Sequence, residues 1–308
     1  AAPPLSITPT TVLIEAESEL PQARRLLPTH PWHAEQSAAF RRLQDWLKPA
    51  FYPRGSVDIE DILAKEMQAV RKSGGLHDLS SIAKIEVSGP DAKAFLDRIY
   101  CSNLADLSAG QIRYSMMLDE SGSILDHGIV ICLADDRFFI TGSSGYEEIL
   151  LAWLEGWLAS DWHDMQVFVS PVTYQWATLL IAGPRSRQIL LDVQRDIDVS
   201  TAAFPYKSVR QGSICGVSAR MIRIGHLGEV SYGIFVPANY GMALWRKIAV
   251  AGRKYDMQPF GEDAYVRLMA EKGHVRMRVA GNAAQTPFDL GFTIDLNKKT
   301  EDFIGKRA

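Results

Sequence analysis

Two adjacent ionisable residues, Asp126 and His127, stand at the head of an apolar run that is typical of a β-strand. Neighbouring side chains on a strand point to opposite faces of the sheet, so one of the two is expected to face the core or a cavity. Burying such a group is costly unless it has a partner or a chemical task. A histidine can act as a general acid or base near neutral pH. The pair indicates proton-transfer chemistry, and a structural histidine with satisfied hydrogen bonds fits the pattern equally well.

The pair belongs to a predicted hairpin. Residues 113–118 and 123–133 are expected to form its strands, and residues 119–122 (Asp-Glu-Ser-Gly) have turn chemistry. Helical spacing of apolar residues predicts further elements at 34–48, 59–74, 145–159 and 239–254. We expect the aromatic residues of the last two helices to pack in the core.

An internal repeat suggests the architecture. Residues 85–96 and 179–190 share the order strand, Gly-Pro turn, helix, and each helix is expected to begin its first turn at the proline. Two such units predict a duplicated α+β fold. We expect a tail or linker at 1–30, then one domain at 31–308 with two intertwined subdomains at approximately 75–170 and 171–290.

The composition excludes several classes of protein. The 308 residues are 47% hydrophobic and 22% charged, which is ordinary for a globular chain. A net charge of −3 argues against a nucleic-acid partner, and no apolar run is long enough to span a membrane. Without a secretory leader at its start, the chain is expected to be cytoplasmic. The chain has three isolated cysteines, Cys101, Cys132 and Cys215. We expect them to be buried thiols in a reducing compartment.

Cofactor motifs are few. His30 and His33 have no acidic or cysteine partner at metal-binding spacing, so no metal site is predicted. No Gly-x-Gly-x-x-Gly follows a strand, so no flavin site is predicted in this chain.

Ordered segments over roughly residues 29–307 resemble the aminomethyltransferase (glycine-cleavage T-protein) family. The resemblance is closer still to the folate-binding C-terminal region of the large subunit of heterotetrameric sarcosine oxidase. The segments are the hairpin and residues 29–33, 70–80, 85–91, 175–184, 225–232, 267–273, 286–291 and 302–307. The resemblance implies a T-protein-like folate-binding fold that lacks the family's usual C-terminal β-rich domain. It also maps residues 29–33 onto a structural tie between the N-terminal arm and the body.

The resemblance implies a folate site that departs from the family at two carboxylates. In the family, the second residue of an Asp-Asp pair lies near the folate N5/N10 edge. Aligned on Gly122 and Gly128, that residue is His127, and Asp126 matches the first. A second family carboxylate, which accepts two hydrogen bonds from the pterin, is replaced by Gly233. Losing it should cost a few kcal/mol of pterin binding, or roughly two orders of magnitude.

Other positions match residues of the family's site. Tyr114 matches an aromatic residue that lines the folate pocket, and a tyrosine on a strand is as often core. His226 stands where the family has an aromatic residue, and Glu229 and Tyr232 follow in the same motif. Arg267 matches a family arginine within a basic cluster that could receive a polyglutamate tail or a substrate carboxylate. A solvated basic face is the alternative interpretation of this cluster. The other cluster members are Lys272, Arg276 and Arg278.

Three functions follow as hypotheses. The first is tetrahydrofolate-linked transfer of a methyl or methylene group from a methylated amine or related donor, with His127 and Asp126 flanking the reacting carbon. The alternative is a non-catalytic subunit of a flavin-dependent amine oxidase or dehydrogenase complex that has lost the folate clamp and is partnered with a flavoprotein. A third is a different small ligand in a pocket that Gly233 and the alanines at 283 and 284 would enlarge.

Overall fold

The computed structural model describes residues 25–55, 58–274, 285–292 and 299–308. The strands are β1 (Arg25–Leu26), β2 (Ala39–Leu43), β3 (Trp46–Phe51), β4 (Gly75–Asp78), β5 (Ile82–Ser88), β6 (Ile112–Leu118), β7 (Ile124–Ala134), β8 (Arg137–Ser144), β9 (Phe168–Pro171), β10 (Trp176–Ala182), β11 (Ser208–Ile214), β12 (Val217–Arg223), β13 (Ser231–Pro237) and β14 (Gln258–Pro259). The helices are α1 (His30–Glu35), α2 (Ile59–Lys72), α3 (Ala92–Ile99), α4 (Glu147–Ala159), α5 (Ser186–Leu191), α6 (Ala238–Gly252) and α7 (Glu262–Glu271), with short 3₁₀ turns η1 (Thr173–Gln175) and η2 (Arg253–Tyr255).

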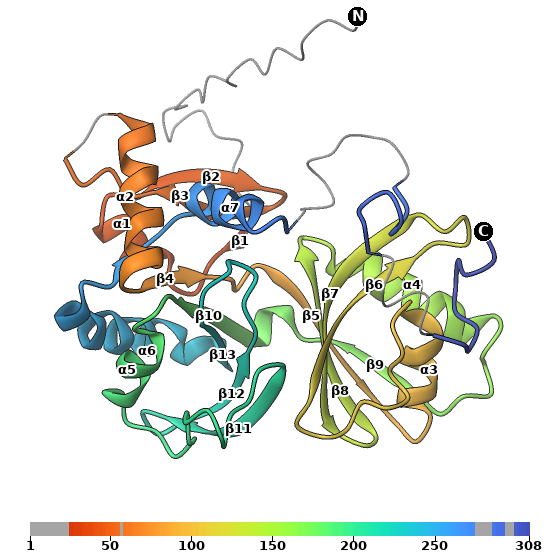
Figure 1. Ribbon diagram of the computed structural model, residues 1–308. Helices are drawn as coiled ribbons and strands as arrows, with labels where there is room; N and C mark the ends of the chain where they lie inside the picture. The colour runs from red at the N-terminus through yellow and green to blue at the C-terminus, as the bar shows by residue number, and fades with distance from the viewer. Residues whose placement is uncertain (1–24, 56–57, 275–284, 293–298) are drawn as a thin grey trace, which may run out of the picture.

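The strands form three sheets with the orders β1-β3-β2, β11-β12-β13-β10-β4-β14 and β6-β7-β8-β5-β9. Figure 1 shows the five-stranded sheet with α3 and α4 on one side of the molecule, and the six-stranded sheet with α5 and α6 on the other. The small sheet lies with α2 and α7 above the six-stranded sheet. Within the described residues, no helix has the length and apolar character needed to cross a membrane.

The repeated units occupy equivalent places in the two large sheets. β5 lies between β8 and β9, and β10 lies between β13 and β4. Gly89 and Gly183, which end these strands, have φ values of 127° and 121°, a conformation that only glycine adopts readily. The helices begin two residues after the prolines, at Ala92 and Ser186, so the prediction that the proline opens the first turn was wrong.

The predicted helix at 34–48 was also wrong, because only Ala34 and Glu35 of it are helical. The rest forms the β2–β3 hairpin, in which Arg42 faces Leu47 and Leu43 faces Trp46. Gln44 at the turn has a φ of 55°. Apolar residues of this segment satisfy a helical period, but they become buried through strand pairing, which a periodic pattern cannot detect.

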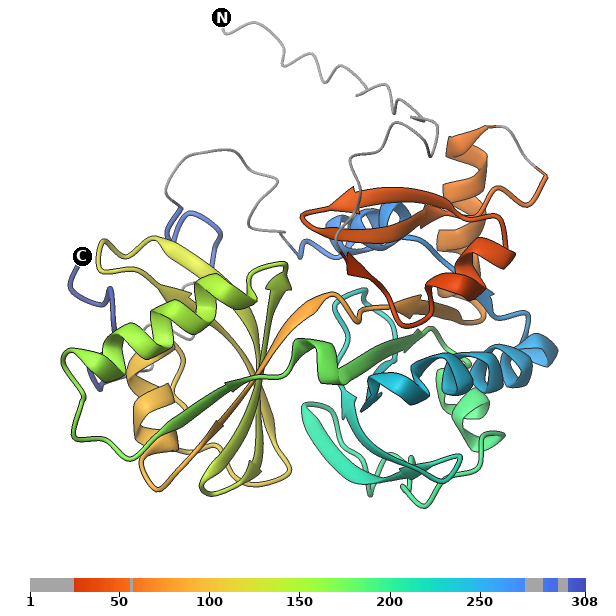
Figure 2. The ribbon, with the colours of Figure 1, turned by 180° about the vertical axis from the view of Figure 1, so that it is seen from behind.

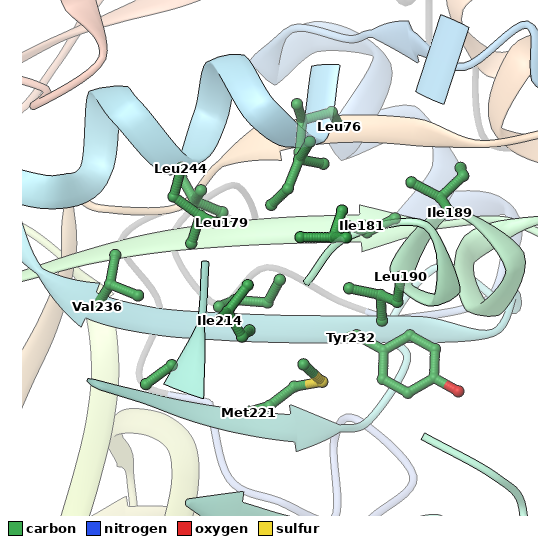
Figure 3. Close-up of a cluster of buried hydrophobic side chains, with 14 of the residues drawn as sticks. Leu76, Leu179, Ile181, Ile189, Leu190, Ile214, Met221, Tyr232, Val236 and Leu244 are labelled. Atoms are coloured by element: carbon green, nitrogen blue, oxygen red, sulfur yellow. The ribbon is translucent and has the colours of Figure 1, made fainter. Parts of the chain in front are cut away.

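The other predicted helices correspond to α2, α4 and α6. Figure 2, seen from behind, shows α6 lying along the six-stranded sheet. In Figure 3, Leu244 of α6 approaches Leu179 of β10 within the core of this sheet. Trp245 is buried in the same core, and Trp153 of α4 packs against the core of the five-stranded sheet. The predicted core role of these aromatic residues is therefore confirmed.

Of the three cysteines, Cys101 and Cys132 are buried and Cys215 is half-buried, all as free thiols. Burial is the main cause that raises the pKa of each thiol. The thiols are consequently protonated at neutral pH.

A buried hydrogen-bond network ties the N-terminal segment to the six-stranded sheet. The Thr29 hydroxyl donates to the Asp78 carboxylate of β4, and it lies 2.7 Å from His33 Nε2. His33 Nδ1 is 2.8 Å from the Tyr52 hydroxyl. The structural tie predicted at residues 29–33 is confirmed, and it starts within the segment whose composition suggested a tail.

Glu66 of α2 holds the backbone just before the start of α7 by a hydrogen bond. Its carboxylate accepts hydrogen bonds from the backbone N–H groups of Tyr52, at 2.7 Å, and Gly261, at 2.8 Å. Burial raises the pKa of Glu66 from 4.5 to about 7, although these two hydrogen bonds oppose the shift. The folded protein therefore binds a proton here between pH 4.5 and 7 that the unfolded chain has lost, and its stability falls as pH rises through that window.

We expect Glu66→Gln to remove this pH dependence, which amounts to roughly 3 kcal/mol. Urea unfolding of the wild type and the variant at pH 5 and pH 8 measures it. The variant should become more stable relative to the wild type at pH 8 than at pH 5. Glu35→Gln, in an exposed pair with Arg246, is the control. An unchanged difference between wild type and Glu66→Gln would contradict the expectation.

Candidate functional site

A cavity of about 140 Å³ lies between the two large sheets. It is lined by residues of β6, β7 and β8 on one side, by β10, β12 and β13 on the other, and by α7. Its apolar wall includes Leu180, Ile222, Phe235 and Met269. An apolar cavity of ~150 Å³ accommodates a benzene ring. The space is therefore suited to a flat ring or the ring portion of a larger ligand.

The predicted hairpin places Tyr114 and His127 on the cavity wall. Tyr114 pairs with Ile129 and His127 with Met116, so the two side chains are diagonal neighbours on one face. The Tyr114 hydroxyl lies 2.9 Å from His127 Nδ1. Burial, followed by the charge of Asp126, raises the pKa of Tyr114, so the phenol is neutral. If Nδ1 carries the imidazole proton and donates it to the tyrosine oxygen, Nε2 retains a lone pair.

Asp126 lies behind the wall of the cavity. Its carboxylate accepts hydrogen bonds from the Ser143 backbone N–H, at 3.0 Å, and from the Ser143 hydroxyl, at 2.5 Å. Ser143 lines the cavity and Asp126 does not. Alternation along β7 sends the two side chains to opposite faces, so the structure brings only His127 of the pair to the cavity.

We expect Asp126→Ala to destabilise the protein by about 1–3 kcal/mol, because the half-buried Ser143 N–H loses its acceptor. Chemical denaturation measures this loss. Ligand affinity at the cavity should change far less than with His127→Ala, which removes a side chain from the wall. A large loss of ligand affinity in Asp126→Ala, with unchanged stability, would mean that the Asp126 carboxylate takes part in ligand binding.

Two further imidazoles complete an aromatic cluster with the hairpin pair. The His226 and His274 ring centroids are 4.9 Å apart, and Tyr114 lies 6.0 Å from the first and 5.4 Å from the second. Burial, then the charges of His274 and His127, lowers the pKa of His226 to about 3. Burial also lowers the pKa of His274. The rings of His226 and His274 are therefore neutral at pH 7 and can donate or accept one hydrogen bond at each nitrogen.

Gly233 lies on β13 at the cavity, as the predicted replacement of a carboxylate requires. A Cβ atom at this position would lie 2.9 Å from Ile222 Cγ1. Ile222 consequently occupies part of the space that a side chain at Gly233 would take. The alanines at 283 and 284, expected to enlarge the pocket, lie outside the described residues.

Three residues predicted to bind a cofactor lie away from the cavity. Glu229 pairs with Arg71 at 3.2 Å. Tyr232 is buried in the core on the opposite face of β13 from Gly233, and its hydroxyl accepts a hydrogen bond from Arg187 at 3.2 Å. Arg267 forms an exposed ion pair with Glu60 at 2.5 Å. The structure therefore does not bring these three side chains into the cavity.

Met269, two residues after Arg267, lines the cavity. Of the basic cluster proposed around Arg267, residues 276 and 278 lie outside the described residues.

Sequence reasoning missed a charged part of the wall. Lys48 Nζ of β3 donates to Glu262 Oε2 at 2.6 Å, and both side chains are at most 5% exposed. Thr178, which lines the same cavity, is also buried. The local signal was weak, because a lysine in a strand and a glutamate at a helix start usually face water. Among the described residues, no group of three or more potential metal ligands occurs.

Comparisons with known proteins identify the family and the fold of the chain. Residues 29–299 match the model of the GCVT N-terminal domain. The chain is 35% identical over 291 residues to sarcosine oxidase subunit alpha of Corynebacterium sp. (strain U-96), with 94% of this chain and 30% of that protein covered. It is 29% identical to an aminomethyltransferase of Corynebacterium aurimucosum, with 90% and 72% covered.

The fold matches the glycine cleavage system aminomethyltransferase T of Bartonella henselae with a TM-score of 0.78 and 25% identity, covering 92% of this chain and 73% of that one. The chain thus spans about 30% of the length of the sarcosine oxidase subunit and most of the aminomethyltransferases. The expected T-protein-like fold is confirmed.

Proposed function

The chain belongs to the GCVT N-terminal domain family, and from that membership we propose that it binds tetrahydrofolate and transfers a one-carbon unit from a methylated amine. The observation that carries the proposal is the Tyr114–His127 pair on the wall of an apolar cavity between the two large sheets. A proton acceptor beside a space for a flat ring is the arrangement that such a transfer needs.

The residues present fit the chemistry of a folate ring. Flat apolar walls accept its faces, Lys48 and Glu262 supply a donor and an acceptor, and the imidazoles of His226 and His274 are neutral. The Thr178 hydroxyl oxygen is buried and has no hydrogen-bond partner in the described part of the chain. A buried polar group without a partner gains free energy when a ligand pairs with it.

Tetrahydrofolate, if bound in this cavity, would supply two nitrogens for a one-carbon unit that already has the oxidation level of formaldehyde. His127 lies on the cavity wall, where its Nε2 would accept a proton during the transfer and return it to the departing amine. Tyr114 holds the imidazole of His127 in the required orientation through the bond to Nδ1. The apolar wall excludes water from the carbon unit, which limits its loss by hydrolysis.

Calorimetric titration of the whole chain with 5-formyltetrahydrofolate tests the binding step. We expect micromolar affinity in the wild type and at least tenfold weaker binding in His127→Ala. Arg267→Ala is the matched control, because this side chain lies outside the cavity and should leave the affinity unchanged. No binding up to millimolar ligand would overturn the proposal.

A second candidate function is a non-catalytic subunit that works beside a flavoprotein. The replacement of the family's two carboxylates by His127 and Gly233 favours it, as does the similarity to sarcosine oxidase subunit alpha. Affinity purification of the chain from its native cells distinguishes the candidates. Recovery of a flavin-containing partner, together with no folate binding, would support the subunit.

A further inference from the structure

We propose that Lys48, Glu262 and Thr178 form a recognition pole of the cavity that binds the lactam edge of a planar heterocycle, meaning a ring amide with adjacent C=O and N–H groups. This inference rests on the proposed folate function and names the residues that select the ring. In the arrangement, Lys48 donates to the ring carbonyl, Glu262 accepts from the ring N–H, and Thr178 bonds to a neighbouring polar atom.

The first argument is the placement of opposite charges on the wall of a mostly apolar cavity. The Lys48 and Glu262 side chains are 2% and 5% exposed, and their charged atoms are 2.6 Å apart. Burying an ion pair is often no better for stability than burying apolar residues of similar volume. The pair is therefore poorly explained by folding alone, and its position at the cavity suits ligand binding.

The second argument is the unpartnered hydroxyl of Thr178. This residue lies on β10, is 1% exposed and lines the same cavity as the ion pair. Its Oγ1 has no hydrogen-bond partner among the described residues. A buried hydroxyl of this kind is expected to have a partner, and the space in front of it is the cavity.

The third argument is the separation of the pole from the imidazole cluster. Glu262, Tyr265 and Met269 of α7 all line the cavity, at the i, i+3 and i+7 spacing of one helix face. Glu262 begins this helix, and His274 follows its end. A ten-residue helix is about 15 Å long, so the cavity has a charged pole and a distant imidazole pole. Recognition and proton transfer are consequently assigned to different ends.

The chemistry of the pole selects the ligand class. A donor beside an acceptor, with no net charge, complements a neutral edge that offers an acceptor beside a donor. The apolar walls formed by Leu180, Ile222 and Phe235 favour a flat ring behind that edge. A ligand group with a single charge at this edge would be repelled by whichever member of the Lys48–Glu262 pair has the same charge.

The test compares two folate ligands that differ at this edge. The first is 5-formyltetrahydrofolate, and the second is its 4-amino analogue, in which an amine replaces the ring carbonyl. We expect the wild type to prefer the lactam at least tenfold in calorimetric titration. The double variant Lys48→Met with Glu262→Leu removes both charges together, and it should bind the two ligands with similar, weaker affinity. A retained preference in this variant would overturn the assignment.

Two further variants test whether a change in ligand affinity merely reflects a change in folding. Thr178→Val keeps the side-chain shape, removes the hydroxyl, and should weaken lactam binding about threefold to tenfold. Asp263→Asn is the matched control, because this neighbour of Glu262 pairs with Arg41 at 2.9 Å instead of lining the cavity. It should leave both affinities unchanged. If Thr178→Val bound the lactam with wild-type affinity, Thr178 would not be part of the recognition pole.

Two smaller probes separate failure of this inference from failure of the folate function. 6-Hydroxymethylpterin carries the lactam edge without the rest of folate. Its binding, lost in the double variant, would support the recognition pole even if the wild type bound no folate. Absence of binding by both ligands would overturn both proposals. If N,N-dimethylglycine bound to the wild type but not to the double variant, the lactam assignment would be overturned. The ligand of the pole would then be a zwitterionic amino acid.

Discussion

Replacing His127 by asparagine is expected to slow one-carbon transfer by about 10²–10⁴-fold, the usual contribution of a general base. Asparagine is polar and of similar size, so it fills the place of the imidazole but cannot accept the proton. The formaldehyde adduct of a secondary amine is a suitable donor, because its carbon unit passes to tetrahydrofolate as the amine and water leave. The measurement is the initial rate of 5,10-methylenetetrahydrofolate formation after subtraction of the uncatalysed rate.

The control for this experiment is Asp126→Ala, since that side chain lies behind the cavity wall. Its transfer rate should stay within a few-fold of the wild type at a temperature where both proteins are folded. A wild-type rate equal to the uncatalysed rate would contradict the enzymatic proposal and favour the subunit function. Equal rates for the wild type and His127→Asn, both above background, would exclude His127 as the base.

Removing the carboxylate of Asp78 is expected to destabilise the fold by about 3–5 kcal/mol, the cost of breaking a buried charged network. Asp78→Ala leaves the Thr29 hydroxyl and the Ser80 backbone N–H without their acceptor, and both groups are buried. It also removes a negative charge 3.9 Å from His33. Urea unfolding at pH 7 measures the loss.

The pH dependence of this effect follows from the pKa of Asp78. Burial acts to raise that pKa, but the hydrogen bonds and charge of His33, with further bonds from Ser80 and Thr29, lower it overall. The folded-state pKa is depressed, so the stabilisation is present above the unfolded value near 3.9 and is lost as pH falls through the folded value. The difference between wild type and Asp78→Ala should therefore shrink in acid.

Asp45→Ala serves as the control for stability, because the Asp45 side chain is partly exposed and pairs with Arg42 at 3.4 Å. Exposed pairs contribute about 0–1 kcal/mol. A loss in Asp78→Ala no larger than in Asp45→Ala would mean that the N-terminal segment is not held through this network.

Local features were predictable from the sequence where local chemistry decides them. The turn of the β6–β7 hairpin is such a case: Asp119 accepts bonds from Ser121 and Ser123, and Gly122 has a φ of 79°. The repeated Gly-Pro units are another, because their glycines require a backbone conformation that other residues avoid. In the segment at 34–48, by contrast, strand pairing within the β2–β3 hairpin overrode the helical period of the apolar residues.

The candidate site was predictable only in part, for the same reason. The family resemblance pointed to Tyr114 and His127, and strand alternation within the hairpin places both side chains on one face. Motif similarity did not reveal the ion partners that hold the Glu229 and Arg267 side chains away from the cavity.

Motifs and short-range periodicity were enough to identify the family and most of the helices and strands. The ion pair between Lys48 and Glu262, which are 214 positions apart, became visible only in the folded protein, as did the place of Thr178 on the wall of the same cavity. Burial and pairing of polar groups depend on how distant segments pack, and the local pattern around each residue carries no record of such a contact.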